Sequence, residues 1–104
     1  MGEVGVVSWR ETPIERRYHA RRLDHTTGDW LPCEYSELRA GDFFQAYTPD
    51  GERVDPVTLE PVDEDVVAYA HENPIKGGGG RRCEGYAIEV SVGPFDVIMR
   101  SLRQ

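Results

Sequence analysis

The sequence predicts a mostly β fold, a small antiparallel barrel or sandwich of five to seven short strands with a short C-terminal helix. Its 104 residues include 11 glycines and 7 prolines, a proportion that favours short strands and turns over long helices. Residues 83–92 alternate between apolar and polar side chains, as a strand with one buried face does. The length suits a single domain over residues 1–104.

The first third of the chain predicts a β-hairpin. Residues 17–23 form a half-exposed strand, and the polar turn at 25–29 connects it to a second strand over 30–35. Pro32 cannot donate a backbone hydrogen bond, so the second strand is expected at an edge or a bulge. Residues 4–9 also favour β structure, although a Thr-Pro pair soon interrupts them.

The middle of the chain predicts a second hairpin. A single turn over 36–42, from a serine to a glycine, precedes an aromatic run at 43–47 that we expect to be a central strand. The Thr-Pro-Asp-Gly sequence at 48–51 is typical of a tight turn, because proline presets φ and glycine accepts a positive φ. The return strand is expected over residues 52–57.

The last third predicts two further strands and a helix. Residues 62–70 form a largely buried strand, 71–82 a loop with four consecutive glycines, and 83–92 an amphipathic strand. Residues 95–103 favour a helix, with a seventh strand as the alternative. The expected core consists of Leu31, Tyr35, Phe43 or Phe44, Val67, Tyr69, Tyr86, Ile88 and Val90.

Both ends of the domain are candidates for contacts outside the core. Residues 1–16 are a candidate N-terminal arm, and residues 94–104 a candidate docking tail. The predicted terminal helix is too short to be stable alone, so it must pack on its own sheet or on a partner. Both alternatives remain open from the sequence.

The charges are unevenly distributed along the chain. The formal net charge is −7, yet residues 24–75 contain thirteen acidic residues and only Arg39 and Arg53 as basic ones. Such a segment is either a set of solvated turns or an acidic surface that meets a basic partner. The flanking segments are rich in arginine and could pair with it within one chain or between chains, which would give a homo-oligomer.

A protein-binding role assigns three groups of candidate contact residues. They are the acidic residues Asp50, Glu52, Asp55, Asp63, Glu64 and Asp65, the basic residues Lys76, Arg81 and Arg82 around the glycine run, and Phe95, Ile98, Arg100 and Leu102 of the C-terminal segment. The basic residues could also belong to a connector that binds nothing.

The motifs of catalysis and cofactor binding are missing from the sequence. The glycine run lacks the following Lys-Ser or Lys-Thr and helix of a phosphate-binding loop. Nucleophile signatures, metal-ligand spacings of histidine and the Cys-x-x-Cys pair are also missing. We therefore expect no enzyme activity, no cofactor and no metal, and two reduced cysteines.

Residues 16–22 are the segment that favours nucleic-acid binding. Four arginines there flank an aromatic residue, a combination that can contact phosphates and stack on a base. The negative net charge opposes approach to a polyanion. Nucleic acid is therefore an alternative partner rather than the expected one.

The turn pattern of the chain resembles that of small phage-encoded β proteins. The stretch 18–30, the segment 36–44 and the Pro-Asp-Gly turn at 49–51 carry the resemblance, which extends over about residues 18–92. In such proteins a leucine, two variable residues, Gly-Asp and an aromatic residue lead into an aromatic strand and a Pro-Asp-Gly hairpin. The resemblance implies a phage origin, and it assigns no catalytic or ligand residues.

Together these observations predict a phage-type protein that binds and modulates a host protein, as an anti-defence or host-takeover accessory. A virion component, such as a capsid decoration or connector subunit, is the alternative. The expected location is the host cytoplasm, or the virion for a structural component. No apolar run reaches the roughly 20 residues that span a bilayer, so no membrane contact is expected.

Overall fold

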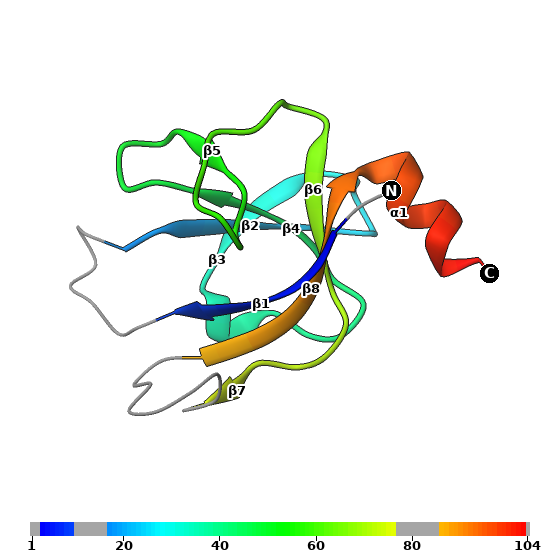
Figure 1. Cartoon of the computed structure of the whole chain (residues 1–104), viewed down its shortest axis with the longest axis horizontal. Helices are drawn as coiled ribbons and strands as arrows, with labels where there is room; N and C mark the ends of the chain where they lie inside the picture. The colour runs from blue at the N-terminus through cyan, green and yellow to red at the C-terminus, as the bar shows by residue number, and fades with distance from the viewer. Residues whose placement is uncertain (1–2, 10–16, 77–85, 104) are drawn as a thin grey trace.

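The computed structural model describes residues 3–9, 17–76 and 86–103. Within them one antiparallel sheet is followed by one helix, α1 (Phe95–Leu102), which confirms the predicted mostly β fold. The main strands, in their order across the sheet, are β1 (Glu3–Trp9), β8 (Tyr86–Pro94), β6 (Val66–Ala70), β4 (Phe43–Tyr47), β2 (His19–Leu23) and β3 (Trp30–Cys33). Two short strands complete it: β5 (Arg53–Val54) pairs with β4, and β7 (Ile75–Lys76) with β8. The sheet is curved and open, with β1 and β3 at its edges (Figure 1).

The two predicted hairpins are present, and their turns form as expected. Gly28 has a φ of 79° in the β2–β3 turn, and Gly51 has a φ of 92° in the β4–β5 turn. The Gly51 N–H donates to the Thr48 carbonyl at 2.9 Å. The return strand β5 is shorter than predicted because Asp55 starts a new turn, in which its carboxylate accepts the N–H of Val57 at 2.7 Å.

One face of the sheet holds the larger core. Phe44, Ile88 and Val90 are completely buried there, and the neighbouring strands add smaller side chains. The 3-10 turn η2 (Tyr35–Glu37) covers this core from the end of β3, and Leu38 after it is also completely buried. The predicted turn therefore begins earlier than expected.

The opposite face holds a second, smaller core beneath α1. Ile98 of α1 is 2% exposed and packs with Phe43 and Val67. The ring of Phe95 lies 4.6 Å from that of Phe43, measured between centroids. Because α1 follows β8 directly, these contacts fold the predicted docking tail back on its own sheet (Figure 1).

Four expectations from the sequence need correction. Leu31 is 43% exposed rather than buried, because it lies on the edge strand β3 opposite Arg22. Tyr69 and Tyr86 are only half-buried. Part of the candidate N-terminal arm, Glu3–Trp9, is a full strand of the sheet. The predicted loop after β6 contains the short strand β7, whereas residues 77–85 and 10–16 lie outside the described residues.

Candidate functional site

The predicted acidic contact residues lie on two connections that we call the acidic loops. Residues 50–52 form the first acidic loop, and residues 55–65 form the second. Figure 1 places both connections at the β5 side of the sheet, above β4. The exposed carboxylates are those of Asp50, Glu52, Glu60, Asp63, Glu64 and Asp65. Asp55 is different, since its carboxylate accepts hydrogen bonds from Val57 and Thr58 and holds its own loop.

The basic parts of the chain do not neutralise the acidic loops within the part that the structure describes. The two ion pairs found there join Arg17 to Glu34 at 3.1 Å and Arg22 to Asp42 at 4.0 Å. Arg53, the basic residue between the acidic loops, donates instead to the backbone carbonyl of Val66. The carboxylates of the acidic loops therefore face solvent together.

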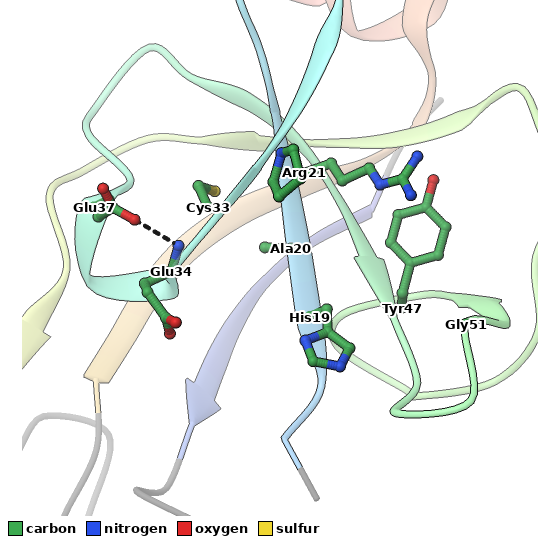
Figure 2. A pocket seen from close by; sticks show the side chains of 9 residues that line it. His19, Ala20, Arg21, Cys33, Glu34, Glu37, Tyr47 and Gly51 are labelled. Atoms are coloured by element: carbon green, nitrogen blue, oxygen red, sulfur yellow. Dashed lines mark hydrogen bonds between the residues drawn. The ribbon is translucent and has the colours of Figure 1, made fainter. Parts of the chain in front are cut away.

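A groove of about 430 Å³ lies beside the first acidic loop, where β2, β3 and β4 meet η2. Its lining residues are His19, Ala20, Arg21, Pro32, Cys33, Glu34, Glu37, Tyr47 and Gly51. Figure 2 shows Glu34 and Glu37 on one side of β2 and Tyr47 on the other. Gly51 connects the groove to the first acidic loop.

The carboxylate side of the groove is organised by a reciprocal cap at the start of η2. The Glu37 carboxylate accepts the backbone N–H of Glu34 at 2.8 Å, as the dashed line in Figure 2 shows. Glu34 lies at the N-cap position of this turn. Such a bond satisfies a backbone donor at a helix start and holds the Glu37 side chain against the turn. The Glu34 carboxylate points to the other side of its own backbone (Figure 2) and accepts from Arg17 at 3.1 Å.

The aromatic side of the groove is fixed by contacts of Tyr47. Its hydroxyl donates to the side-chain carbonyl of Gln45 at 2.7 Å, and the Arg21 guanidinium lies 5.0 Å from the ring centroid.

Burial raises the pKa of the Cys33 thiol to about 11, although the positive charge of Arg22 opposes this shift. The thiol in the groove is therefore protonated at neutral pH and is a poor nucleophile.

The other predicted contact residues differ in their exposure. On α1, Phe95 and Leu102 are 36% and 41% exposed and Arg100 is exposed, so these three remain at the surface. Ile98 is buried within its own chain and does not face a partner. Lys76 lies in β7. Arg81 and Arg82 lie outside the described residues.

One contact between strands could not be foreseen from the sequence. The ring Nε2 of His71, the residue after β6, lies 2.5 Å from the hydroxyl oxygen of Ser91 on β8. The Tyr69 ring lies 5.1 Å from the His71 ring, measured between centroids. Neither residue of this pair lines the groove.

Neither a metal-binding cluster nor a membrane-spanning helix is found among the described residues. No three His, Cys, Asp or Glu side chains in them cluster closely enough to hold a metal ion. None of their helices has the length and apolar character to cross a membrane. Comparison of the chain with protein-family models, curated proteins and solved structures finds no match.

Proposed function

We propose that this chain is a non-catalytic protein that binds a basic surface of a partner protein through its acidic loops. The observation that carries this proposal is the group of exposed carboxylates around β5, to which no described cation is ion-paired. Like charges held close together repel one another, and a partner with the opposite potential relieves that repulsion on binding.

The setting that we propose is a phage accessory protein that binds and modulates a host protein. The turn pattern of residues 18–51 supports a phage origin, and the acidic loops supply a surface for proteins that themselves bind nucleic acid. Such proteins present arginine and lysine to phosphates, so their binding faces are basic. A clustered acidic surface complements those faces.

A virion component is the second proposal, and α1 favours it. Phe95 and Leu102 leave apolar surface exposed next to the exposed Arg100, a combination suited to contacts between neighbouring subunits. The copy number in purified particles separates the two settings. Stoichiometric presence supports the virion role, whereas absence from particles combined with early expression supports the host-directed role.

Nucleic-acid binding is less favoured because three of the four arginines expected to serve it, those that the structure describes, have partners within the chain. Arg17 and Arg22 are ion-paired with carboxylates, and Arg21 lies over the Tyr47 ring. Binding phosphates through them would require breaking these contacts and bringing a polyanion near the acidic loops.

The decisive experiment compares two charge-matched triple variants in binding to the purified partner. One variant removes charges from the second acidic loop (Asp63→Asn, Glu64→Gln, Asp65→Asn), and the control removes three exposed charges elsewhere (Asp29→Asn, Glu89→Gln, Asp96→Asn). The partner is first identified by affinity capture and mass spectrometry, and it is then reconstituted. We expect about a tenfold or greater loss of affinity for the loop variant and less than about twofold for the control. Equal losses would overturn the proposal.

A further inference from the structure

The helix α1 leaves part of its apolar surface in solvent. It packs mainly against β8 and β6, and Figure 1 shows it at one side of the molecule, beside the ends of these strands. Ile98 is turned into the smaller core and is buried, whereas Phe95 and Leu102 remain exposed and Met99 is half-buried. The helix therefore docks with one side on its own sheet and presents a second apolar side to water.

The residues of this second side form one row along the helix. Phe95, Met99 and Leu102 are spaced by four and three positions, and residues at these spacings lie one above another on a helix surface. The row extends for about 11 Å at the rise of 1.5 Å per residue. Its first member is held in place, because the ring of Phe95 lies 4.6 Å from that of Phe43. Such a row suits packing against another helix along its length.

The charges beside this row are separated by sign along α1. Asp96 lies in the first turn, Arg100 lies in the last turn, and Arg103 follows the helix. All three side chains are exposed. Among the described residues, no ion pair joins any of them to another side chain. The start of α1 is therefore negative and its end is positive.

The second acidic loop strengthens the negative end. Its last residue, Asp65, precedes Val66, and Val66 pairs with Pro94 immediately before α1. The loop therefore ends beside the start of the helix. A uniformly basic partner would be repelled at the end of α1, and a uniformly acidic partner at its start. A surface with one acidic and one basic end is instead complementary to a copy of itself turned by 180°.

We propose that α1 packs antiparallel against α1 of a second copy of this chain, across a two-fold axis near Met99. Phe95 of each copy then lies near Leu102 of the other, and Asp96 lies near Arg103. The contact joins two helices of eight residues, so the dimer is weak and forms at high protein concentration. This inference goes beyond the proposed function and does not depend on the binding of a basic partner.

The test is analytical ultracentrifugation of two charge-reversal variants, alone and mixed, between about 10 μM and about 1 mM protein. Asp96→Arg and Arg103→Asp should each weaken dimerisation about tenfold or more, because each variant places like charges at both contacts. An equimolar mixture should dimerise within about threefold of the original chain, since both contacts of the mixed dimer again join arginine to aspartate. A monomeric original chain, or a mixture that associates no better than its components, would overturn the inference.

The mixture also separates the contact from the stability of the helix. Both reversals oppose the helix dipole, and mixing does not remove that effect, so recovery in the mixture reports the contact between copies. Circular dichroism confirms that each variant is folded. The controls are Asp29→Arg and Arg21→Asp, which make the same charge changes at exposed positions outside α1. They should change dimerisation less than about twofold and gain nothing on mixing.

The apolar row is tested by a second pair of variants. Leu102→Ala should weaken dimerisation about threefold or more, because its side chain is buried only in the dimer. Leu31→Ala is the control, since Leu31 is similarly exposed but lies on β3. Unequal effects support the inference, and equal effects contradict it.

Dimerisation and partner binding are measured separately. The partner measurement uses the chain well below the concentration at which it dimerises, because its control triple variant includes Asp96→Asn. If the chain stays monomeric while the second-loop triple variant loses the partner, this inference is wrong and the proposed function stands. If charge reversal controls dimerisation while the triple variant keeps the partner, the proposed function is wrong and this inference stands.

Discussion

Leu59 is a residue whose backbone conformation conflicts with its side chain. It has a φ of 62°, the left-handed region that glycine adopts far more easily than leucine. The turn imposes this conformation, because the Leu59 N–H donates to the Asp55 carbonyl at 2.7 Å. The side chain is 45% exposed, so it gains little from burial in return.

We predict that Leu59→Gly stabilises the chain by about 1 kcal/mol, because glycine removes the cost of a left-handed conformation for a residue with a Cβ. The greater freedom of glycine in the unfolded chain reduces this gain somewhat. Urea unfolding measures the difference. Leu31→Gly is the control, since Leu31 is similarly exposed but lies in a strand, where glycine destabilises. A loss of stability in Leu59→Gly would show that the side chain packs more than its exposure suggests.

The Cys33 thiol gives a prediction with a defined pH range. Burial raises its pKa from 9.0 to about 11, so the neutral thiol is favoured in the folded chain. Its contribution to stability is complete below pH 9 and is lost as the pH rises toward 11. In a Cys83→Ser background, we expect iodoacetamide to alkylate Cys33 slowly at pH 8 and at the rate of a free thiol once the chain is unfolded in urea. Fast alkylation of the folded chain at pH 8 would contradict the raised pKa.

The residues that sequence predicts well are those whose role is local. Gly51 could be assigned to its turn because the requirement for a positive φ arises within four consecutive residues. Leu31 could not be assigned correctly, because its burial depends on whether another strand lies beside β3. The alternation of residues 30–35 carries no information about that neighbour, and β3 is an edge strand. Glu34 and Glu37 were overlooked for the same reason, because the groove that they line exists only after three strands have paired.

At the level of elements, α1 depends on the sheet for its stability. The helix has only eight residues, fewer than an isolated helix needs in water. Ile98 anchors it against Phe43 and Val67, whereas Leu102 near its end is 41% exposed. The apolar contact at Ile98 therefore decides whether the helix stays docked.

We predict that Ile98→Ala destabilises the chain by about 2–4 kcal/mol, through lost burial and the cavity left behind. Leu102→Ala in the same helix should cost less than about 1 kcal/mol, because its side chain is already largely in water. Thermal unfolding followed by circular dichroism measures both variants. Equal costs would indicate that α1 is not held by the contact with Phe43 and Val67.

The elements themselves were predictable to different degrees. β4, β6 and β8 carry runs of buried apolar residues, and the helix after Pro94 carries a proline at its start and arginine near its end, so each was recognisable. β7 was not, because its two residues are a strand only through pairing with Tyr86 and Ala87 of β8. Pairing across the sheet is a tertiary interaction, and local sequence does not encode it.

At the scale of the molecule, the residues that the structure describes place no ion-paired basic side chain on the acidic loops. The net charge is −7, and the described ion pairs lie around β2 and η2, away from the acidic loops. The arginines that precede and follow the acidic segment in sequence therefore do not close over it within the described chain. Self-association through α1 remains a prediction, and with Ile98 buried it would rely on the exposed parts of Phe95 and Leu102.

The repulsion left in the acidic loops leads to a prediction about salt. Asp63, Glu64 and Asp65 are consecutive and exposed, and added salt shortens the range over which their charges repel. We predict that the free energy of unfolding rises by about 0.5–1 kcal/mol between about 20 mM and about 300 mM KCl. The second-loop triple variant should lose most of this dependence, whereas the control triple variant, with the same net charge, should keep more of it. If both variants respond equally to salt, the stability depends on the total charge of the chain and not on the concentration of charge in the acidic loops. The surface of these loops would then lack the local potential that binding to a basic partner requires.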